Sequence, residues 1–386
     1  MLFGKFLMNT TAFLSLEDIS DNLPRYDESV ISVDMDEVLQ QAYEKLEEDI
    51  RSAMKAHRGN TSLMSILLNT LLLYPDHPYD FDEIWARAFD PQTKEYVKFL
   101  VTEPENLTRE ALYAKERALI TDVKEELRQG RRCQIYATYT GEKNVTLRLE
   151  AVLRQEGIRV AVLRSSVATD KREDWYDRQL KAGVEVVVCH PKLVETGLDL
   201  LAFPTLYFYE TGYSLHTLRQ ASRRSWRIGQ RFPVRVKFLT YSGTMQETCL
   251  RLMGKKMLVA LMMEGKFSGE GLQALDADED LMSAMARELV EKAGVGESAD
   301  AVWRDLGHER EKVLPRPAAV EPESEEEPDL IPDLSIRDLP AASAAEPVPT
   351  PFGIRLIDPN QISTKRKKGA LWPTASDTNA QLSLFD

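Results

Sequence analysis

The sequence predicts an α/β protein in which a doubly wound parallel sheet follows a helical segment. Between Arg131 and about Glu264, short apolar stretches alternate with amphipathic helical stretches, and this alternation is typical of a parallel sheet covered on both faces. The apolar stretches are nearly continuous, as in VEVVVCH at 184–190, which is the pattern of a strand buried on both sides. Before residue 131, apolar residues recur at helical spacing instead.

The composition and the net charge limit the classes of protein to which this chain can belong. A chain of 386 residues with 43% hydrophobic residues has enough apolar material for one or two globular domains. The net charge of -13 argues against non-specific coating of nucleic acid, although a local basic site remains compatible with it. Cys133, Cys189 and Cys249 form no CxxC pair, so we expect reduced, buried thiols in a cytoplasmic protein. No apolar run is long enough to cross a membrane, and the histidines show no metal-ligand spacing.

Three helices are predicted before the sheet. Apolar residues recur at helical spacing from Asp36 to His57. The stretch from Leu63 to Leu73 is apolar on nearly every side, which predicts a buried helix that the prolines of YPDHPYDF terminate. A third helix is expected to run from a Thr108 cap to Gln129, with Gly130 as its C-terminal stop.

From Gly130 onward, predicted strands and helices alternate. We expect strands in CQIYATY, IRVAVLR, VEVVVCH, TLYFYE and PVRVKFLTY. The helices expected among them are Asn144–Gln155, Asp170–Lys181, Leu215–Trp226 and Thr244–Met263. Such sheets bind ligands beyond the carboxyl ends of their strands. An arginine-rich passage, RQASRRSWRIGQR at 219–231, leads out of one such end.

The composition shifts again towards the C-terminus. After Arg310, proline, alanine and acidic residues dominate, and few apolar residues are available for a core, which predicts a disordered tail. The stretch from Asp276 to Asp305 keeps helical periodicity and is expected to pack on the globular part. We therefore divide the chain into a helical, insertion-like segment at 1–107, the sheet domain at 108–275, a helical extension at 276–310 and an acidic, proline-rich tail at 311–386.

The arginine-rich passage resembles the final motif of the Swi/Snf-like helicases, the double-stranded-DNA translocases of helicase superfamily two. That motif reads QAxxRxxRIGQ, then V-x-V and T-x-E-E, and the matching residues here are Gln220, Ala221, Arg224, Arg227, Ile228, Gly229, Gln230, Val234, Val236, Thr244 and Glu247. GLDL at 197–200 resembles the preceding motif, and CQIYATYT resembles the strand that opens the lobe. DNLP and LLNTLLLYPDHPYDF look like the helical insertion of the family. The resemblance implies a RecA-like second motor lobe.

Two arginines carry the chemistry that the resemblance implies. Arg224 and Arg227 are three positions apart, so we expect them on one face of the predicted helix. A guanidinium group stays charged and binds oxygens bidentately. By resemblance, both are arginine fingers that stabilise charge on a transferred γ-phosphoryl group, Gln220 helps to position them, and Gly197 and Asp199 belong to the same cofactor site. The alternative is a solvated basic surface.

The resemblance places DNA backbone contacts on the loops after the strands, at Thr138, Tyr139 and Lys192. Translocases grip phosphates and not base edges, so no sequence specificity is expected. Ordinary strand-end packing is the alternative for Thr138 and Tyr139. The chain departs from the family pattern at Leu193–Glu195, where a small glycine pair is usual, and at Asp199, where asparagine is usual; both departures put DNA contacts there in doubt.

A motor of this class also needs a first lobe. That lobe carries a GxxxxGK[ST] loop, whose amides and lysine cradle phosphates, and an acidic motif for magnesium. Neither pattern occurs in this sequence. ATP with Mg²⁺ is therefore expected to bind mainly to a first lobe supplied in cis or in trans, and the chain to be a fragment, part of an interrupted gene or a separate subunit. The alternative is a DNA- or clamp-binding module without catalysis.

The last residues form a second recognisable element. QLSLF at 381–385 resembles the short peptide by which bacterial proteins dock on the replicative sliding clamp. Leu384 and Phe385, together with Leu382, would fill an apolar pocket while Gln381 forms a hydrogen bond at its rim. A peptide on a disordered tether binds modestly but reaches far. The resemblance implies a clamp partner and a bacterial, phage or mobile-element setting; a chance apolar terminus is the alternative.

Overall fold

A computed structural model describes most of the chain up to residue 313. The described residues are 23–57, 60–90, 92, 94–141, 143–194, 197–212, 214–263, 281–291 and 298–313. Within these ranges, no helix combines the length and the apolar character needed to span a bilayer. The predicted acidic tail from residue 314 onward and the clamp-like peptide at 381–385 lie outside the described residues.

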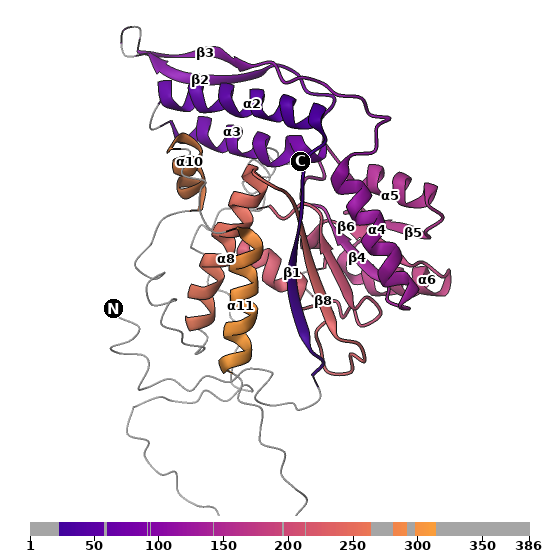
Figure 1. Cartoon of the computed structure of the whole chain (residues 1–386). Coiled ribbons are helices and arrows are strands. Elements are labelled where there is room, and N and C mark those ends of the chain that lie inside the picture. Colours follow the sequence, from indigo (N-terminus) through magenta and orange to yellow (C-terminus); the bar gives the residue numbers. More distant parts are fainter. Residues whose placement is uncertain are drawn as a thin grey trace, which may run out of the picture. The chain divides into compact units, whose positions relative to one another are not determined.

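A six-stranded parallel sheet forms the centre of the described part (Figure 1). In spatial order, its strands are β1 (Tyr26–Val33), β8 (Val234–Tyr241), β7 (Thr205–Phe208), β4 (Cys133–Tyr136), β6 (Val186–Cys189) and β5 (Val160–Leu163). From β4 the chain passes outward to β5, returns to β6 and then crosses to β7 and β8 on the other side. This reversal confirms the predicted doubly wound sheet, a fold in which ligands bind beyond the carboxyl ends of the strands at the reversal.

Helices cover both faces of the sheet because alternate strand residues point to opposite sides. One core contains Ile135 of β4 and Val188 of β6, packed with residues of α4 (Ala114–Arg128) and α5 (Thr146–Gln155). The other core contains Tyr136 and Cys189 of the same strands. It packs against α6 (Arg172–Lys181), α7 (Leu215–Ser222), α8 (Met245–Met263) and α11 (Ala299–Val313).

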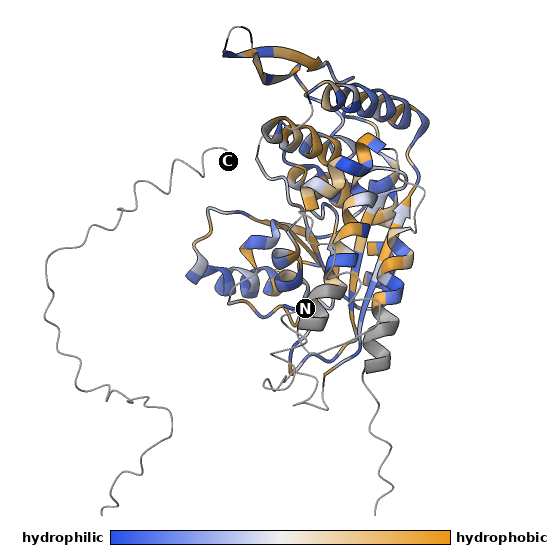
Figure 2. Cartoon of the chain, turned by 90° about the vertical axis from the view of Figure 1, so that its left-hand side faces the viewer, coloured by the Kyte–Doolittle hydropathy of each residue, from blue (hydrophilic) through white to orange (hydrophobic). Residues whose placement is uncertain are grey.

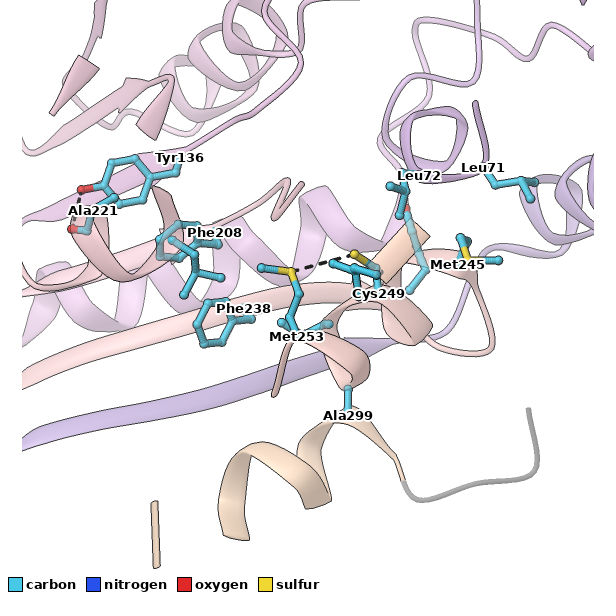
Figure 3. Close-up of a cluster of buried hydrophobic side chains, with 14 of the residues drawn as sticks. Leu71, Leu72, Tyr136, Phe208, Ala221, Phe238, Met245, Cys249, Met253 and Ala299 are labelled. Atoms are coloured by element: carbon cyan, nitrogen blue, oxygen red, sulfur yellow. Dashed lines mark hydrogen bonds between the residues drawn. The ribbon is translucent and has the colours of Figure 1, made fainter. Parts of the chain in front are cut away.

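Figure 3 shows the second core between the sheet and α8. The rings of Phe208 and Phe238 stack with centroids 5.2 Å apart, and Phe238 lies 4.4 Å from the ring of Trp303 on α11. The Trp303 indole donates a hydrogen bond to the carbonyl of Leu250 at 3.0 Å. A Cβ at Gly254 would lie 2.8 Å from the Val302 side chain, so glycine permits the close approach of α8 and α11.

The N-terminal part contains the two long helices that the sequence predicts and two features that it does not. The helices are α2 (Glu37–Ala56) and α3 (Thr61–Leu73), and a 3-10 turn, η2 (Tyr74–Asp76), follows at the predicted proline stop. The additional features are β1, which pairs with β8 along its whole length, and a hairpin of β2 (Ile84–Asp90) and β3 (Glu95–Thr102). α10 (Leu281–Glu291) lies within the predicted helical extension, whereas α11 runs to Val313, past the predicted end of that extension at residue 310.

The helix predicted from Thr108 begins later, at Ala114, and that expectation was wrong. The reason is a stronger cap: the Glu116 carboxylate accepts a hydrogen bond from the backbone N–H of Tyr113 at 3.0 Å. The Thr108 hydroxyl instead donates to Glu110. At the other end the prediction holds, because Gly130 follows the helix with a φ of 73°, the left-handed conformation that glycine adopts at no steric cost.

Candidate functional site

The predicted site residues lie in two groups. Thr138 and Tyr139 follow β4 and Lys192 follows β6, so they belong to the carboxyl edge of the sheet, as predicted from the sequence. The second group comprises Gly197 and Asp199, in the connection before β7, and the arginine passage after α7. Hydrogen bonds between the connection before β7 and the passage after α7 hold the second group together.

The arginine passage does not continue α7. The helix ends at Ser222, with Arg223 as its C-cap, so Arg224 and Arg227 lie in the turns beyond it. The expectation of a helix to Trp226, with both arginines on one helical face, was therefore wrong. The cause is tertiary: the Ser225 hydroxyl donates to the carbonyl of Phe203 at 2.7 Å, which draws the chain onto the connection before β7.

Gln230, the last residue of the motif, organises this passage. Its buried amide nitrogen donates to the carbonyls of Leu201 at 3.0 Å and Ser225 at 3.1 Å. Its amide oxygen accepts from the backbone N–H groups of Arg231 and Phe232, at 2.9 and 3.1 Å. These bonds use the full hydrogen-bonding capacity of the side chain. Sequence reasoning assigned Gln230 no role, although its fixed place after Arg-Ile-Gly was the signal.

Arg224 and Arg227 occupy different environments. Arg224 is only 9% exposed, and its Nη2 lies 3.4 Å from the Gln220 amide oxygen. The Arg227 side chain is 42% exposed and pairs with Asp199, with Nε 3.3 Å from Oδ1. Since an exposed ion pair of this kind is weak, Arg227 is available to an external anion that competes with Asp199. Gly197, at a φ of 75°, is exposed and precedes Asp199 by two positions in the same connection.

Trp226, in the middle of the arginine passage, packs inward. Its side chain is 8% exposed, and its indole donates to the carbonyl of Pro24 at 2.8 Å. Its ring lies 5.3 Å from that of Tyr26, at the start of β1. The arginine passage is thereby fixed to the first strand of the sheet.

At the carboxyl edge, Glu210 ties together the loops after β4 and β7. Its carboxylate accepts from the Tyr139 backbone N–H at 2.8 Å, and its carbonyl accepts from the Thr138 hydroxyl at 2.8 Å. A Cβ at Gly212 would lie 2.9 Å from the Thr138 methyl group, so the glycine, at a φ of 62°, permits this contact. These contacts favour strand-end packing for Thr138 and Tyr139. Lys192 is exposed.

Glu210 borders a buried polar network that connects this edge to η2. Lys115 places its ammonium 2.9 Å from Asp76 Oδ1 and donates to the Gln246 amide oxygen at 3.0 Å. The Gln246 amide nitrogen in turn donates to Asp76 Oδ2 at 2.7 Å. Burial raises the pKa of Asp76 and lowers that of Lys115. Burial, together with the charge of Asp76, raises the pKa of Glu210 to about 8.

The described residues offer cationic groups rather than a metal site. No cluster of three histidine, cysteine, aspartate or glutamate residues suited to a metal ion occurs among them. The arginines fit an anion such as phosphate, because the guanidinium fork matches its oxygens. The clamp-binding candidates, Gln381, Leu382, Leu384 and Phe385, lie outside the described residues.

Comparison with known proteins gives one family match. Residues 115–229 match the helicase conserved C-terminal domain. Among curated proteins, the chromatin-remodeling ATPase INO80 of Saccharomyces cerevisiae is 26% identical over 200 residues, which cover 51% of this chain and 13% of that protein. The chromodomain-helicase-DNA-binding protein 3 homolog of Caenorhabditis elegans is 22% identical over 291 residues, which cover 73% of this chain and 16% of that protein. The chain thus spans 13 to 16% of the length of these relatives.

Two solved structures are also similar. The C-terminal part of the Fun30 ATPase domain aligns with a TM-score of 0.49 and 14% identity, covering 70% of this chain and 99% of that chain. The SWI2/SNF2 ATPase core of Sulfolobus solfataricus in complex with dsDNA aligns with a TM-score of 0.43 and 16% identity. The alignment covers 68% of this chain and 51% of that chain.

Proposed function

We propose, from the helicase C-terminal domain matched at residues 115–229, that this chain supplies the second motor lobe of an ATP-driven translocase of double-stranded DNA. The domain match and the relatives support a Swi/Snf-like helicase C-terminal lobe. The observation that carries the proposal is Arg227. It is a half-exposed cation on a turn whose shape Gln230 fixes, and its present partner is an exposed carboxylate.

This chain would contribute positive charge to a site completed by another lobe. ATP with Mg²⁺, held mainly by a first lobe, would supply the phosphoryl group whose transfer drives movement. Arg227 would turn from Asp199 to that group and neutralise its charge. Arg224 is the second candidate finger, but it would first have to leave the buried position where it contacts Gln220. Gly197, exposed two positions before Asp199, leaves that point of the connection free of a side chain.

Duplex DNA is the proposed partner of the carboxyl edge. Lys192 is exposed on a short 3-10 turn after β6, and its backbone N–H donates to His190 Nδ1 at 3.0 Å. This turn, and the loops that Glu210 joins, would meet phosphates and not bases, so binding would depend on salt and not on sequence. Thr138 and Tyr139 would contribute little directly, since the Thr138 hydroxyl and the Tyr139 backbone N–H are both bonded to Glu210.

Reconstitution tests the proposed function directly. The full chain, mixed with a separately expressed first lobe of this helicase class, should hydrolyse ATP faster when duplex DNA is added, and neither protein should do so alone. Phosphate release with and without DNA is the measurement, and the DNA upstream of the gene is the first place to look for that lobe. A first lobe that binds this chain without any DNA-stimulated hydrolysis would favour the non-catalytic module.

A second candidate function is clamp docking through the terminal QLSLF peptide. The observation that favours it is the apolar cluster at the end of an acidic, proline-rich stretch. Phe385→Ala should abolish retention of the full chain on immobilised bacterial sliding clamp, because the ring would fill an apolar pocket. Ser383→Ala is the matched control and should bind as the parent does. Equal retention of the Phe385→Ala variant would contradict clamp docking.

A further inference from the structure

The outer face of the β2–β3 hairpin carries an unusual set of exposed side chains. Three alternate rungs of the antiparallel pair point the same way, and they pair Trp85 with Leu100, Arg87 with Lys98 and Phe89 with Tyr96. All six side chains are exposed, and Tyr96 reaches 72%. In Figure 2 the hairpin, at the top of the view, is coloured partly as hydrophobic and partly as hydrophilic. We call these six residues the hairpin face.

The opposite side of the hairpin is attached to the protein. Ala86 is buried, and the ring of Phe99 stacks on His57 at the end of α2, with centroids 4.3 Å apart. The Thr102 hydroxyl donates to Asp49 of α2 at 2.6 Å, and the Asn60 amide donates to the carbonyl of Arg87 at 2.7 Å. The hairpin face is therefore held outward on a fixed support, on the far side of α2 from the sheet (Figure 1).

The hairpin face carries two positive charges, Arg87 and Lys98, which an anion would neutralise. Arg87 and Lys98 lie directly opposite one another, and like charges at that position destabilise a strand pair. No acidic residue belongs to the three rungs. Lys98 is placed over the ring of Trp85 at 4.8 Å. Glu83 does touch the face, but it accepts the indole N–H of Trp85 at 2.9 Å and so fixes the orientation of that ring.

The aromatic rings lie on either side of these cations. Successive outward residues of a strand are about 7 Å apart, so Trp85 and Phe89 are separated by the Arg87 position. Phe89 and Tyr96 meet edge to face, with centroids 5.6 Å apart. Exposed rings on a sheet, with cations between them, are the arrangement by which proteins stack unpaired bases and hold the phosphates that join them.

We propose that the hairpin face binds a single strand of nucleic acid. Trp85, Phe89 and Tyr96 stack on its bases, while Arg87 and Lys98 contact its phosphates and relieve their mutual repulsion. The strand must be unpaired, because the bases of a duplex are already stacked on one another. This site is separate from the duplex contacts proposed at the carboxyl edge, and it does not depend on ATP or on a first lobe.

Binding of fluorescent oligonucleotides to the full chain tests this proposal. Anisotropy should show tighter binding of a 20-nucleotide oligothymidylate than of a blunt duplex of equal length. Trp85→Ala and Tyr96→Ala should each weaken single-strand binding by about tenfold, because stacking is lost. Trp85→Phe should retain most of it. Replacing both Arg87 and Lys98 by glutamine should lower the slope of log affinity against log salt by about 1.4.

Leu147→Ala is the control, since Leu147 is an exposed apolar residue on α5, away from the hairpin. It should bind oligothymidylate as the parent does, and circular dichroism should show all variants folded. The proposal is overturned if the parent does not bind oligothymidylate, or if Trp85→Ala and Tyr96→Ala bind as the parent does. It is also overturned if these variants lose duplex binding to the same extent. Self-association that Tyr96→Ala removes, without oligonucleotide binding, would assign the hairpin face to a second copy of the chain.

Discussion

Replacing Arg227 by alanine is expected to lower DNA-stimulated ATP hydrolysis of the reconstituted motor by about a thousandfold or more. The reason is that Arg227 is the exposed guanidinium of the motif, and a finger acts on charge that develops during phosphoryl transfer. Substrate binding should change little, so the loss should appear in kcat rather than in KM for ATP. Steady-state phosphate release over a range of ATP concentrations, at saturating duplex DNA, separates the two parameters.

Two further variants sharpen this prediction. Arg227→Lys retains the charge but loses the fork that binds two oxygens, so it should recover only part of the rate. Arg231→Ala removes an exposed arginine of the same passage, whose backbone bond to Gln230 does not need its side chain, and it should hydrolyse ATP at the parental rate. If Arg227→Ala is as active as the parent, the finger assignment fails, and the motor-lobe proposal then rests on the domain match alone.

Replacing Lys115 by methionine should destabilise the fold by about 3–5 kcal/mol. The Lys115 side chain is 1% exposed and its partner Asp76 is fully buried, so the variant leaves an unpaired carboxylate inside the protein. Chemical denaturation followed by circular dichroism gives the change in unfolding free energy. Because a carboxyl whose pKa is raised on folding destabilises the fold as pH rises, the deficit should shrink on acidification.

A surface pair and a double variant serve as controls. Lys124 pairs with Glu156, but both side chains are more than a third exposed, so Lys124→Met should cost less than about 1 kcal/mol. Combining Lys115→Met with Asp76→Asn removes both charges and should recover most of the lost stability. An equal loss for the Lys115 and Lys124 variants would show that the buried pair contributes no more than a surface pair.

Most of the sheet domain could be predicted from the sequence, because its strands are short, apolar and buried on both sides. β1 was missed because YDESVISV mixes acidic and apolar residues, and its pairing with β8 is a contact that no local pattern reports. The hairpin was missed because one of its faces is exposed and aromatic. Its strands therefore lack the alternation of apolar and polar residues that marks a half-buried strand.

The site residues were identified from a sequence motif. Their geometry differs from the prediction where contacts between distant parts of the chain determine the backbone path. Nothing in RQASRRSW breaks a helix, yet the Ser225 bond to Phe203 ends α7 before the arginines. As a result, Arg224 is buried while Arg227 is exposed, a difference that spacing alone could not give. Thr138 was predicted to face DNA, but its hydroxyl is bonded to the loop after β7, a partner distant in the sequence.

The pairing of β1 with β8 also has a consequence for how the protein is made. Tyr26 is paired with Val234, so the first strand leaves the ribosome long before its partner exists. At about 5–20 residues per second, the wait lasts roughly 10 to 40 seconds. During that time, β1 has no strand to pair with, and the Pro24 carbonyl and the Tyr26 ring have no Trp226 indole to contact. A chaperone that shields the nascent N-terminus would act in this interval, and a translation pause before β8 would lengthen it.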